Sequence, residues 1–278
     1  MKLEIEAIPE DSLFLKFLYQ TVPGRVILKG LSSVHLSKAV GAFFDSPLSL
    51  PIIPLFIKLN KIDMSEYRET GYKCFNDFFT RKLKPHARAF DMDPRHFVAP
   101  CDGLLSVYRI DKDMVIPVKQ SSYSISSLLK NPELAQKYEG GTALVFRLCV
   151  NHYHRYAYPV TGRKSYNKHI KGVLHTVRPI ALRNRPVFTE NSREYTLIKS
   201  KEFGTILQME VGAMLVGKIQ NYHRAAYVRR GQEKGRFLYG GSTIILLIQK
   251  DKVNFSRGLF AATEHGFEIP VKMGESLN

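Results

Sequence analysis

A series of short apolar runs beyond residue 97, rich in β-branched residues, constrains the fold most strongly. Clusters of Gly, Pro, Asn or Lys separate these runs, as turns separate strands. One helix is expected between them, at 124–138. The pattern predicts a β-rich body. The runs lie at 104–110, 114–118, 142–150, 172–177, 204–211, 214–219 and 243–248.

The front of the chain has a different character. Apolar residues cluster at 13–19 and again at 39–59, where Asp45 and three prolines interrupt them. A membrane-spanning helix needs about 20 apolar residues with few charges. The interrupted segment therefore favours short amphipathic helices or a re-entrant hairpin lying on a membrane. The alternative is a set of helices packed on the rest of the protein.

These two patterns together predict an α+β fold, with a β-rich catalytic body and amphipathic N-terminal helices. We expect a helical membrane-associating region at 1–70 and a β-rich domain at 71–278. Residues 65–90, which span the boundary between the two regions, are expected to form a helix followed by a basic loop. Asn76 or Asp77 is the expected cap of that short helix.

Charge points to the kind of partner. The 278 residues include 41 Lys and Arg against 25 Asp and Glu, a formal charge of +16. Such an excess suits nucleic acid or an anionic lipid surface, although solvated surface lysines are the plain alternative. The hydrophobic content of 44% excludes a disordered chain. Three cysteines without a CxxC pair predict neither a disulfide framework nor a zinc knuckle.

A glycine pair before a very apolar run carries the most chemical information. Gly240 and Gly241 are followed by Ser242 and Thr243. Glycine lets the backbone adopt angles that expose a carbonyl to attack. A serine hydroxyl at this place can attack the preceding carbonyl in an N-to-O acyl shift. An ordinary β-turn before a strand is the alternative interpretation.

Other segments supply groups that activate a nucleophile. Asp102 lies in a Pro-x-Asp-Gly turn, His154 follows an apolar run, and His175 lies within another. An aspartate, a histidine and a serine from separate segments are the usual components of an activated serine. His152 and His154 are two residues apart, but no carboxylate or thiol cluster accompanies them, so we predict no metal.

Six motifs in a fixed order resemble the phosphatidylserine decarboxylase family. The resemblance runs from about Phe75 to Ile248. It rests on Asn-Asp-Phe-Phe-Thr-Arg-Lys-Leu-Lys-Pro at 76–85, Pro-x-Asp-Gly at 100–103, Tyr-His-Arg at 153–155, Val-Gly-Ala-x-x-Val-Gly at 211–217, Lys-Gly-Arg-Phe at 234–237 and Gly-Ser-Thr at 241–243.

The resemblance implies a proenzyme that cuts itself between Gly241 and Ser242. The products would be a β-chain of residues 1–241 and an α-chain of residues 242–278, which stay together as a heterodimer. Ser242 would become a covalent pyruvoyl group, the only cofactor. That group would form a Schiff base with phosphatidylserine, which loses CO2 and becomes phosphatidylethanolamine.

The resemblance also implies site residues. Asp102 matches the aspartate that assists self-cleavage, and His154 matches the first histidine of Tyr-His-Arg-x-His. The second histidine is replaced by Ala157. Either His175 or His154 is the expected base for Ser242, and His154 is the alternative proton donor during decarboxylation. Arg147 and Lys119 are among many basic candidates for the substrate's phosphate or carboxylate.

The expected partners are phosphatidylserine and an anionic membrane, with no nucleic acid. We expect peripheral attachment to the cytoplasmic face of a cell membrane, and a homodimer is one assembly that the resemblance implies. Two alternatives stay open. One is a pyruvoyl enzyme with a different amino-acid-derived substrate. The other, favoured by Ala157, is an uncleaved paralogue that only binds anionic lipid or nucleic acid.

Overall fold

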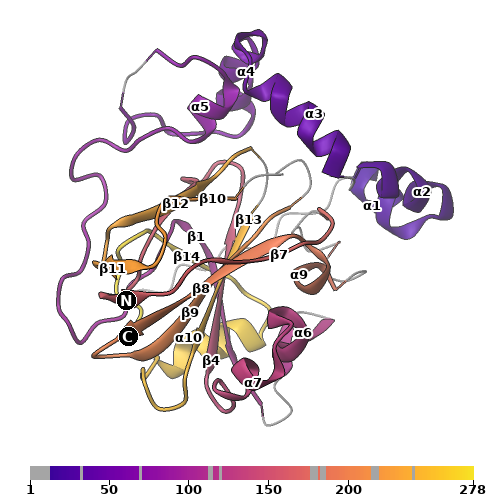
Figure 1. Ribbon diagram of the computed structural model, residues 1–278. Helices are drawn as coiled ribbons and strands as arrows, with labels where there is room; N and C mark the ends of the chain where they lie inside the picture. The colour runs from indigo at the N-terminus through magenta and orange to yellow at the C-terminus, as the bar shows by residue number, and fades with distance from the viewer. Residues whose placement is uncertain are drawn as a thin grey trace.

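The computed structural model describes residues 13–31, 34–68, 71–111, 115–118, 121–175, 181, 186–213, 219–239 and 242–278. Over these residues the predicted α+β fold is confirmed, because helices come first and a β-rich body follows. In Figure 1 the first helices form an arm that projects from the β-rich body. The elements of the arm are α1 (Leu13–Gln20), α2 (Val22–Leu31), α3 (Val34–Phe44), η1 (Pro47–Ser49), α4 (Ile52–Leu59) and the short α5 (Phe75–Phe79).

The body is built on one large antiparallel sheet. Its strand order is β11-β6-β8-β9-β13-β4-β1-β14, and β7 also pairs with β8. Every residue of the central strand β13 is buried, as expected for an apolar run covered on both faces. The strands are β1 (Gly103–Arg109), β4 (Thr142–Leu148), β6 (Gly162–Lys164), β7 (Lys168–Ile170), β8 (Arg193–Ser200), β9 (Gly204–Val211), β11 (Ala226–Val228), β13 (Ser242–Ile248) and β14 (Ile269–Val271).

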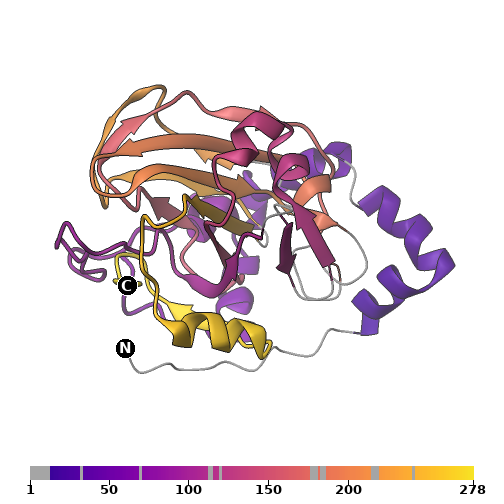
Figure 2. The same ribbon diagram turned by 90° about the horizontal axis from the view of Figure 1, so that it is seen from below.

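A smaller sheet lies against the large one and joins it through buried polar contacts. Its strands are β5 (Arg155–Ala157), β10 (Ile219–Asn221) and β12 (Glu233–Phe237), in the order β10-β12-β5. A separate ribbon pairs β2 (Val115–Val118) with β3 (Ser121–Ser124). The helices α6 (Ile125–Leu129), α7 (Pro132–Gln136), α9 (Val187–Glu190) and α10 (Arg257–Glu264) pack around the large sheet, as Figure 2 shows for α10.

The single helix expected at 124–138 is wrong, because the chain forms two short helices there. Lys130 ends α6 in the left-handed conformation, with φ of 47°. Asn131 then caps α7, and its side chain accepts a hydrogen bond from Leu134 N. Proline disfavours helical geometry in the residue before it, so Asn131-Pro132 separates the two helices.

Three other local predictions are corrected or lie outside the description. Within 172–175, Val173 forms only an isolated bridge with Asn191, and 176–177 lie outside the described residues. Of the run at 214–219, only Ile219 is described, in β10. The helix α5 begins after Cys74, so neither Asn76 nor Asp77 caps it.

The N-terminal helices bury some apolar side chains and expose others. Leu18, Tyr19 and Leu28 join the main core. A second core gathers Ile53, Phe75, Phe78 and Phe79 with several neighbours. Among the described helices, none is both long and apolar enough to cross a membrane. The exposed large apolar residues of this region are Leu13, Phe17, Val22, Val26, Ile27, Phe43, Leu48, Leu55 and Leu59.

Candidate active site

Ser242 is the first residue of β13, at the centre of the large sheet. It pairs with Leu148 on β4, and its neighbour Thr243 pairs with Arg147 on β4 and Val211 on β9. The side chain is fully buried, and its Oγ has no hydrogen-bond partner among the described residues. The predicted cleavage partner Gly241 lies outside the described residues. A buried serine hydroxyl that carries a proton and lacks a partner is suited to a chemical role.

Asp102 lies at the same end of the sheet, immediately before β1. Because β4 separates β1 from β13, and neighbouring strands are about 4.8 Å apart, the backbones of Asp102 and Ser242 are about 10 Å apart. Asp102 Oδ1 accepts hydrogen bonds from Arg88 Nε and Met273 N, each at 2.9 Å. Arg88 Nη2 also lies 2.5 Å from Asp102 Oδ2. The carboxylate is therefore held in place by a buried ion pair.

Burial lowers the pKa of Arg88, but hydrogen bonds to Asp102 and Glu66 outweigh this effect and raise it overall. Arg88 therefore stays charged. No sequence pattern indicates this partner of Asp102, because Arg88 is one of several basic residues between positions 80 and 95.

His154 is fully buried just before β5. Its Nδ1 lies 2.9 Å from the carbonyl oxygen of His152. A carbonyl only accepts hydrogen bonds, so Nδ1 carries a proton and Nε2 is the nitrogen that can gain or lose one. The ring packs on Phe79, with centroids 4.0 Å apart. The backbone of His154 is tied to β12, because its oxygen accepts a hydrogen bond from Phe237 N.

His175 is connected to the strand beside Ser242 through Asn191. Asn191 Oδ1 accepts from His175 N, and Asn191 Nδ2 donates to the oxygens of His175 and Gly212. Gly212 follows Val211, which pairs with Thr243. The imidazole itself lies 3.3 Å from a Glu190 carboxylate oxygen, measured from Nε2, and its centroid is 6.2 Å from that of Tyr19 on α1.

Ala157 lies where the Pro-x-Asp-Gly turn meets the small sheet. Its amide donates to the oxygen of Pro100, and its own oxygen accepts from Gln208 Nε2 at 3.3 Å. The methyl group offers no proton acceptor at this position. The backbone of β5 nevertheless stays next to the Asp102 turn.

A cavity of about 360 Å³ opens beside Asp102. Asp102, Arg88, Glu66, Lys272 and His152 are among the residues that line it. Burial lowers the pKa of His152 to about 4, so this ring is neutral at pH 7. In the sequence, His152 stands out only by its spacing from His154, which is typical of metal ligands. Among the described residues, no group of His, Cys, Asp or Glu is arranged to hold a metal ion.

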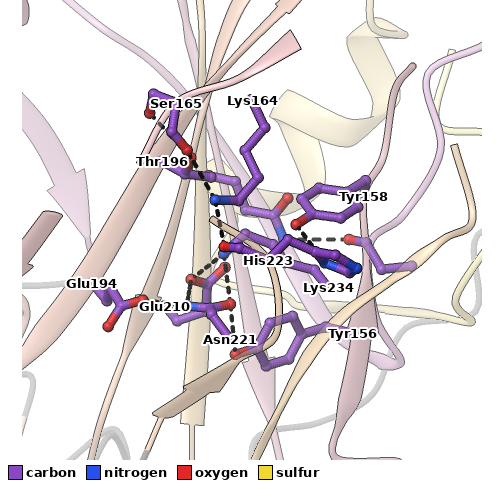
Figure 3. A network of polar contacts seen from close by, with 12 residues as sticks. Tyr156, Tyr158, Lys164, Ser165, Glu194, Thr196, Glu210, Asn221, His223 and Lys234 are labelled. Atoms are coloured by element: carbon purple, nitrogen blue, oxygen red, sulfur yellow. Dashed lines mark hydrogen bonds and ion pairs between the residues drawn. The ribbon is translucent and has the colours of Figure 1, made fainter. Parts of the chain in front are cut away.

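A buried polar network lies between the two sheets, and Figure 3 shows it. Lys234 Nζ is 2.5 Å from Glu210 Oε2 and 2.9 Å from Asn221 Oδ1. Asn221 Nδ2 in turn donates to Glu194 and Glu210. Burial raises the pKa of Glu210 and lowers that of Lys234, while their mutual contact opposes both shifts.

This network lies close to Ser242. Glu210 pairs directly with Ile244 on β13, and paired residues share a face of the sheet. Side chains alternate along a strand, so Ile244 and Ser242 also share a face. Glu210 and Ser242 therefore lie diagonally across adjacent strands on one face. No local pattern predicts the contact between Glu210 and Lys234, since one lies in an apolar run and the other in a polar segment.

The two basic candidates for substrate binding have different outcomes. Arg147 is buried and forms an ion pair with Glu268, whose two carboxylate oxygens lie 3.1 Å and 2.5 Å from Nε and Nη2. Because this buried ion pair occupies the guanidinium, Arg147 stabilises the fold and does not present its charge to a substrate. Lys119 lies outside the described residues.

Comparison with known proteins agrees with the resemblance. The family described as "Phosphatidylserine decarboxylase" matches residues 75–278. The protein named phosphatidylserine decarboxylase proenzyme 2 of Clostridium acetobutylicum is 42% identical, over 95% of this chain and 90% of its own length. The phosphatidylserine decarboxylase proenzyme of Clostridium kluyveri is 39% identical, over 99% of this chain and 94% of its own. The phosphatidylserine decarboxylase proenzyme of Clostridium perfringens is 42% identical, over 95% of this chain and 92% of its own length. The predicted family is thus confirmed, and the chain belongs to the phosphatidylserine decarboxylase family.

Proposed function

We propose that this chain is a self-cleaving carboxy-lyase that converts phosphatidylserine to phosphatidylethanolamine and CO2. The observation that carries the proposal is the place of Ser242. The serine of the Gly-Ser-Thr motif is buried at the start of the central strand, two strands from the Asp102 turn. The names of the three relatives, all proenzymes of this activity, support the same function.

Self-cleavage starts with Ser242. Its Oγ loses a proton and attacks the carbonyl carbon of Gly241, which converts the amide into an ester. Elimination from the ester then releases the new carboxylate of Gly241 and leaves a dehydroalanine at position 242. Hydrolysis of that residue releases ammonia and creates a pyruvoyl group at the start of residues 242–278. The partnerless Oγ of Ser242 fits this role, because no described hydrogen bond has to be broken before attack.

A pyruvoyl group supplies an electron-accepting carbonyl for decarboxylation of an amino acid derivative. The chain's own residues handle the protons and the substrate. His154, with Nδ1 held by the His152 carbonyl, keeps Nε2 as a basic nitrogen that can hold and deliver a proton. The ion pair between Asp102 and Arg88 fixes the turn beside the site.

Two histidine variants test which histidine transfers the proton in self-cleavage and which in decarboxylation. We expect His175→Ala to slow self-cleavage, and His154→Ala to slow decarboxylation per cut chain, each by about 10²- to 10⁴-fold, the usual contribution of general acid–base catalysis. Gel densitometry measures the first rate and CO2 release measures the second. His265→Ala, an exposed residue after α10, is the control. Full-rate cutting of the His175→Ala chain would exclude His175 and leave His154 as the base.

We propose further that residues 1–70 attach the enzyme to the membrane that contains its substrate, while 71–278 carry the chemistry. Exposed leucines on the front helices, including Leu48, Leu55 and Leu59, support this proposal. Basic residues of the same helices, among them Arg25 and Lys58, suit an anionic surface.

Vesicle sedimentation tests the attachment. Binding should require anionic lipid and weaken as the salt rises from 0.1 M to 1 M, since the screening length falls from about 10 Å to about 3 Å. The double variant Leu48→Ser/Leu55→Ser should bind on the order of 100-fold or more weakly, because each buried leucine contributes about 1.5–3 kcal/mol and about 1.4 kcal/mol corresponds to a factor of ten. Tyr227→Ser, an equally exposed change on β11, is the control. Equal binding to neutral vesicles in 1 M salt would contradict the electrostatic part.

The second candidate function is an uncleaved paralogue that binds anionic lipid without catalysis. Ala157, in place of the family histidine, is the observation that favours it. Incubating the purified protein with phosphatidylserine vesicles separates the two functions. The proposed enzyme produces phosphatidylethanolamine and CO2. A chain that binds the vesicles and leaves their lipid unchanged is the paralogue.

A further inference from the structure

We propose that Asn76 and Tyr239 are positioning residues for self-cleavage, through which the N-terminal helices hold the backbone that leads to the Gly241–Ser242 bond. This inference rests on the proposed function. It assigns the front helices a part in maturation of the enzyme, in addition to membrane attachment.

Asn76 joins the two ends of this connection with one side chain. It lies in α5 and is buried, with 4% of its surface exposed. Its Oδ1 accepts a hydrogen bond from Tyr239 N at 2.9 Å. Its Nδ2 donates to Asp45 Oδ1, also at 2.9 Å, just after α3. The amide thus links the end of α3 to a residue three positions before Ser242.

Four phenylalanines from three different helices surround the ring of Tyr239, and we call these five rings the aromatic cluster. The centroid of Tyr239 lies 4.5 Å from that of Phe44 on α3 and 6.1 Å from that of Phe56 on α4. It lies 5.0 Å and 5.2 Å from those of Phe75 and Phe79 on α5. Edge-on contacts of this kind fix the orientation of a ring as well as its depth.

The helix α5 also touches the small sheet on the other side of the site. Thr80, directly after α5, accepts hydrogen bonds from Arg155 Nε on β5 and Arg236 Nη1 on β12. Phe79 packs on His154. In Figure 1, α4 and α5 lie above β10 and β12. The short helix α5 and the residue after it therefore contact the end of α3, the predicted catalytic histidine and the strand β12.

Geometry explains why this support matters for the reaction. The acyl shift needs Oγ within about 3–3.5 Å of the carbonyl carbon that it attacks, and an error of about 1 Å can cost on the order of 100-fold in rate. The register of β13 places Ser242. The Gly241 carbonyl belongs to the segment that begins at Tyr239, so a displaced Tyr239 would displace the electrophile but not the nucleophile.

The test measures cleavage and folding separately. Each variant is made twice, once with Ser242 to follow the appearance of the small chain, and once with Ser242→Ala to measure the folded fraction of an uncut chain. Asn76→Ala is expected to slow cleavage 10- to 100-fold at a temperature where its uncut form stays folded. Asp77→Ala is the matched control, because Asp77 is an exposed neighbour on α5 that accepts only from Lys73 N in the described contacts.

Tyr239 provides the second arm. Tyr239→Ala should slow cleavage to a similar degree, and Tyr239→Phe, which keeps the ring in the aromatic cluster, should restore most of the rate. Cutting of both alanine variants at the unmodified rate would overturn the inference. So would a slowing that only matches the loss of folded chain. An unmodified protein that never cuts would instead show that the proposed function is wrong.

Discussion

Replacing Ser242 with alanine should leave the chain uncut and abolish phosphatidylethanolamine formation. The reason is chemical, because alanine has no oxygen to attack the Gly241 carbonyl and no leaving group for the later elimination. The protein should still fold, since the change removes one buried oxygen that has no partner among the described residues. A denaturing gel of the purified protein, combined with a decarboxylase assay, measures both effects.

The matched control is Ser256→Ala. Ser256 belongs to the same 37-residue segment, 242–278, but it is exposed before α10. That variant should cut and decarboxylate like the unmodified protein. A Ser242→Ala chain that still produces the small fragment would contradict the proposed cleavage site.

Replacing Lys234 with methionine should greatly lower the free energy of unfolding. Lys234 and Glu210 are both fully buried, and the substitution would leave the Glu210 carboxylate without its cation. Breaking a buried pair from one side costs about 3–5 kcal/mol. That is a large part of the usual stability of about 5–15 kcal/mol for a domain. Calorimetry in the uncut Ser242→Ala background should record a fall in Tm of roughly 10 °C.

A double variant distinguishes the lost charge partner from simple loss of packing. Lys234→Met/Glu210→Leu removes both charges, so it should recover most of the stability, as buried pairs replaced by apolar residues often do. Lys199→Met, a change of an exposed side chain on β8, should have little effect. If Lys234→Met costs no more than Lys199→Met, the pair is not buried in solution.

The sequence predicted the parts of the fold that depend on local pattern. Runs at 104–110, 142–150, 204–211 and 243–248 became β1, β4, β9 and β13, because β-branched apolar segments bounded by turn residues suit buried strands. The short α5 was also expected near Phe78. Its predicted cap, Asn76 or Asp77, is wrong, because the helix begins after Cys74. The amide of Asn76 makes tertiary contacts with Asp45 and Tyr239 and does not cap the helix end.

Single motifs predict individual residues of the candidate site but not the partners of those residues. Ser242, Asp102 and His154 follow from motifs, and the sheet brings Ser242 and the Asp102 turn to the same end. The partners of these residues depend on strand register and on contacts between distant segments. Arg88 beside Asp102 and Lys234 beside Glu210 are separated by 14 and 24 residues, so no local pattern reveals them.

The intact mass of the small chain from the purified protein tests the proposed self-cleavage at Ser242. We expect a chain of residues 242–278 that begins with a ketone, so it lacks an α-amine and gains two hydrogens on treatment with borohydride. A small chain that begins with an ordinary Ser242 amine, or a protein that remains one chain of 278 residues, would contradict it.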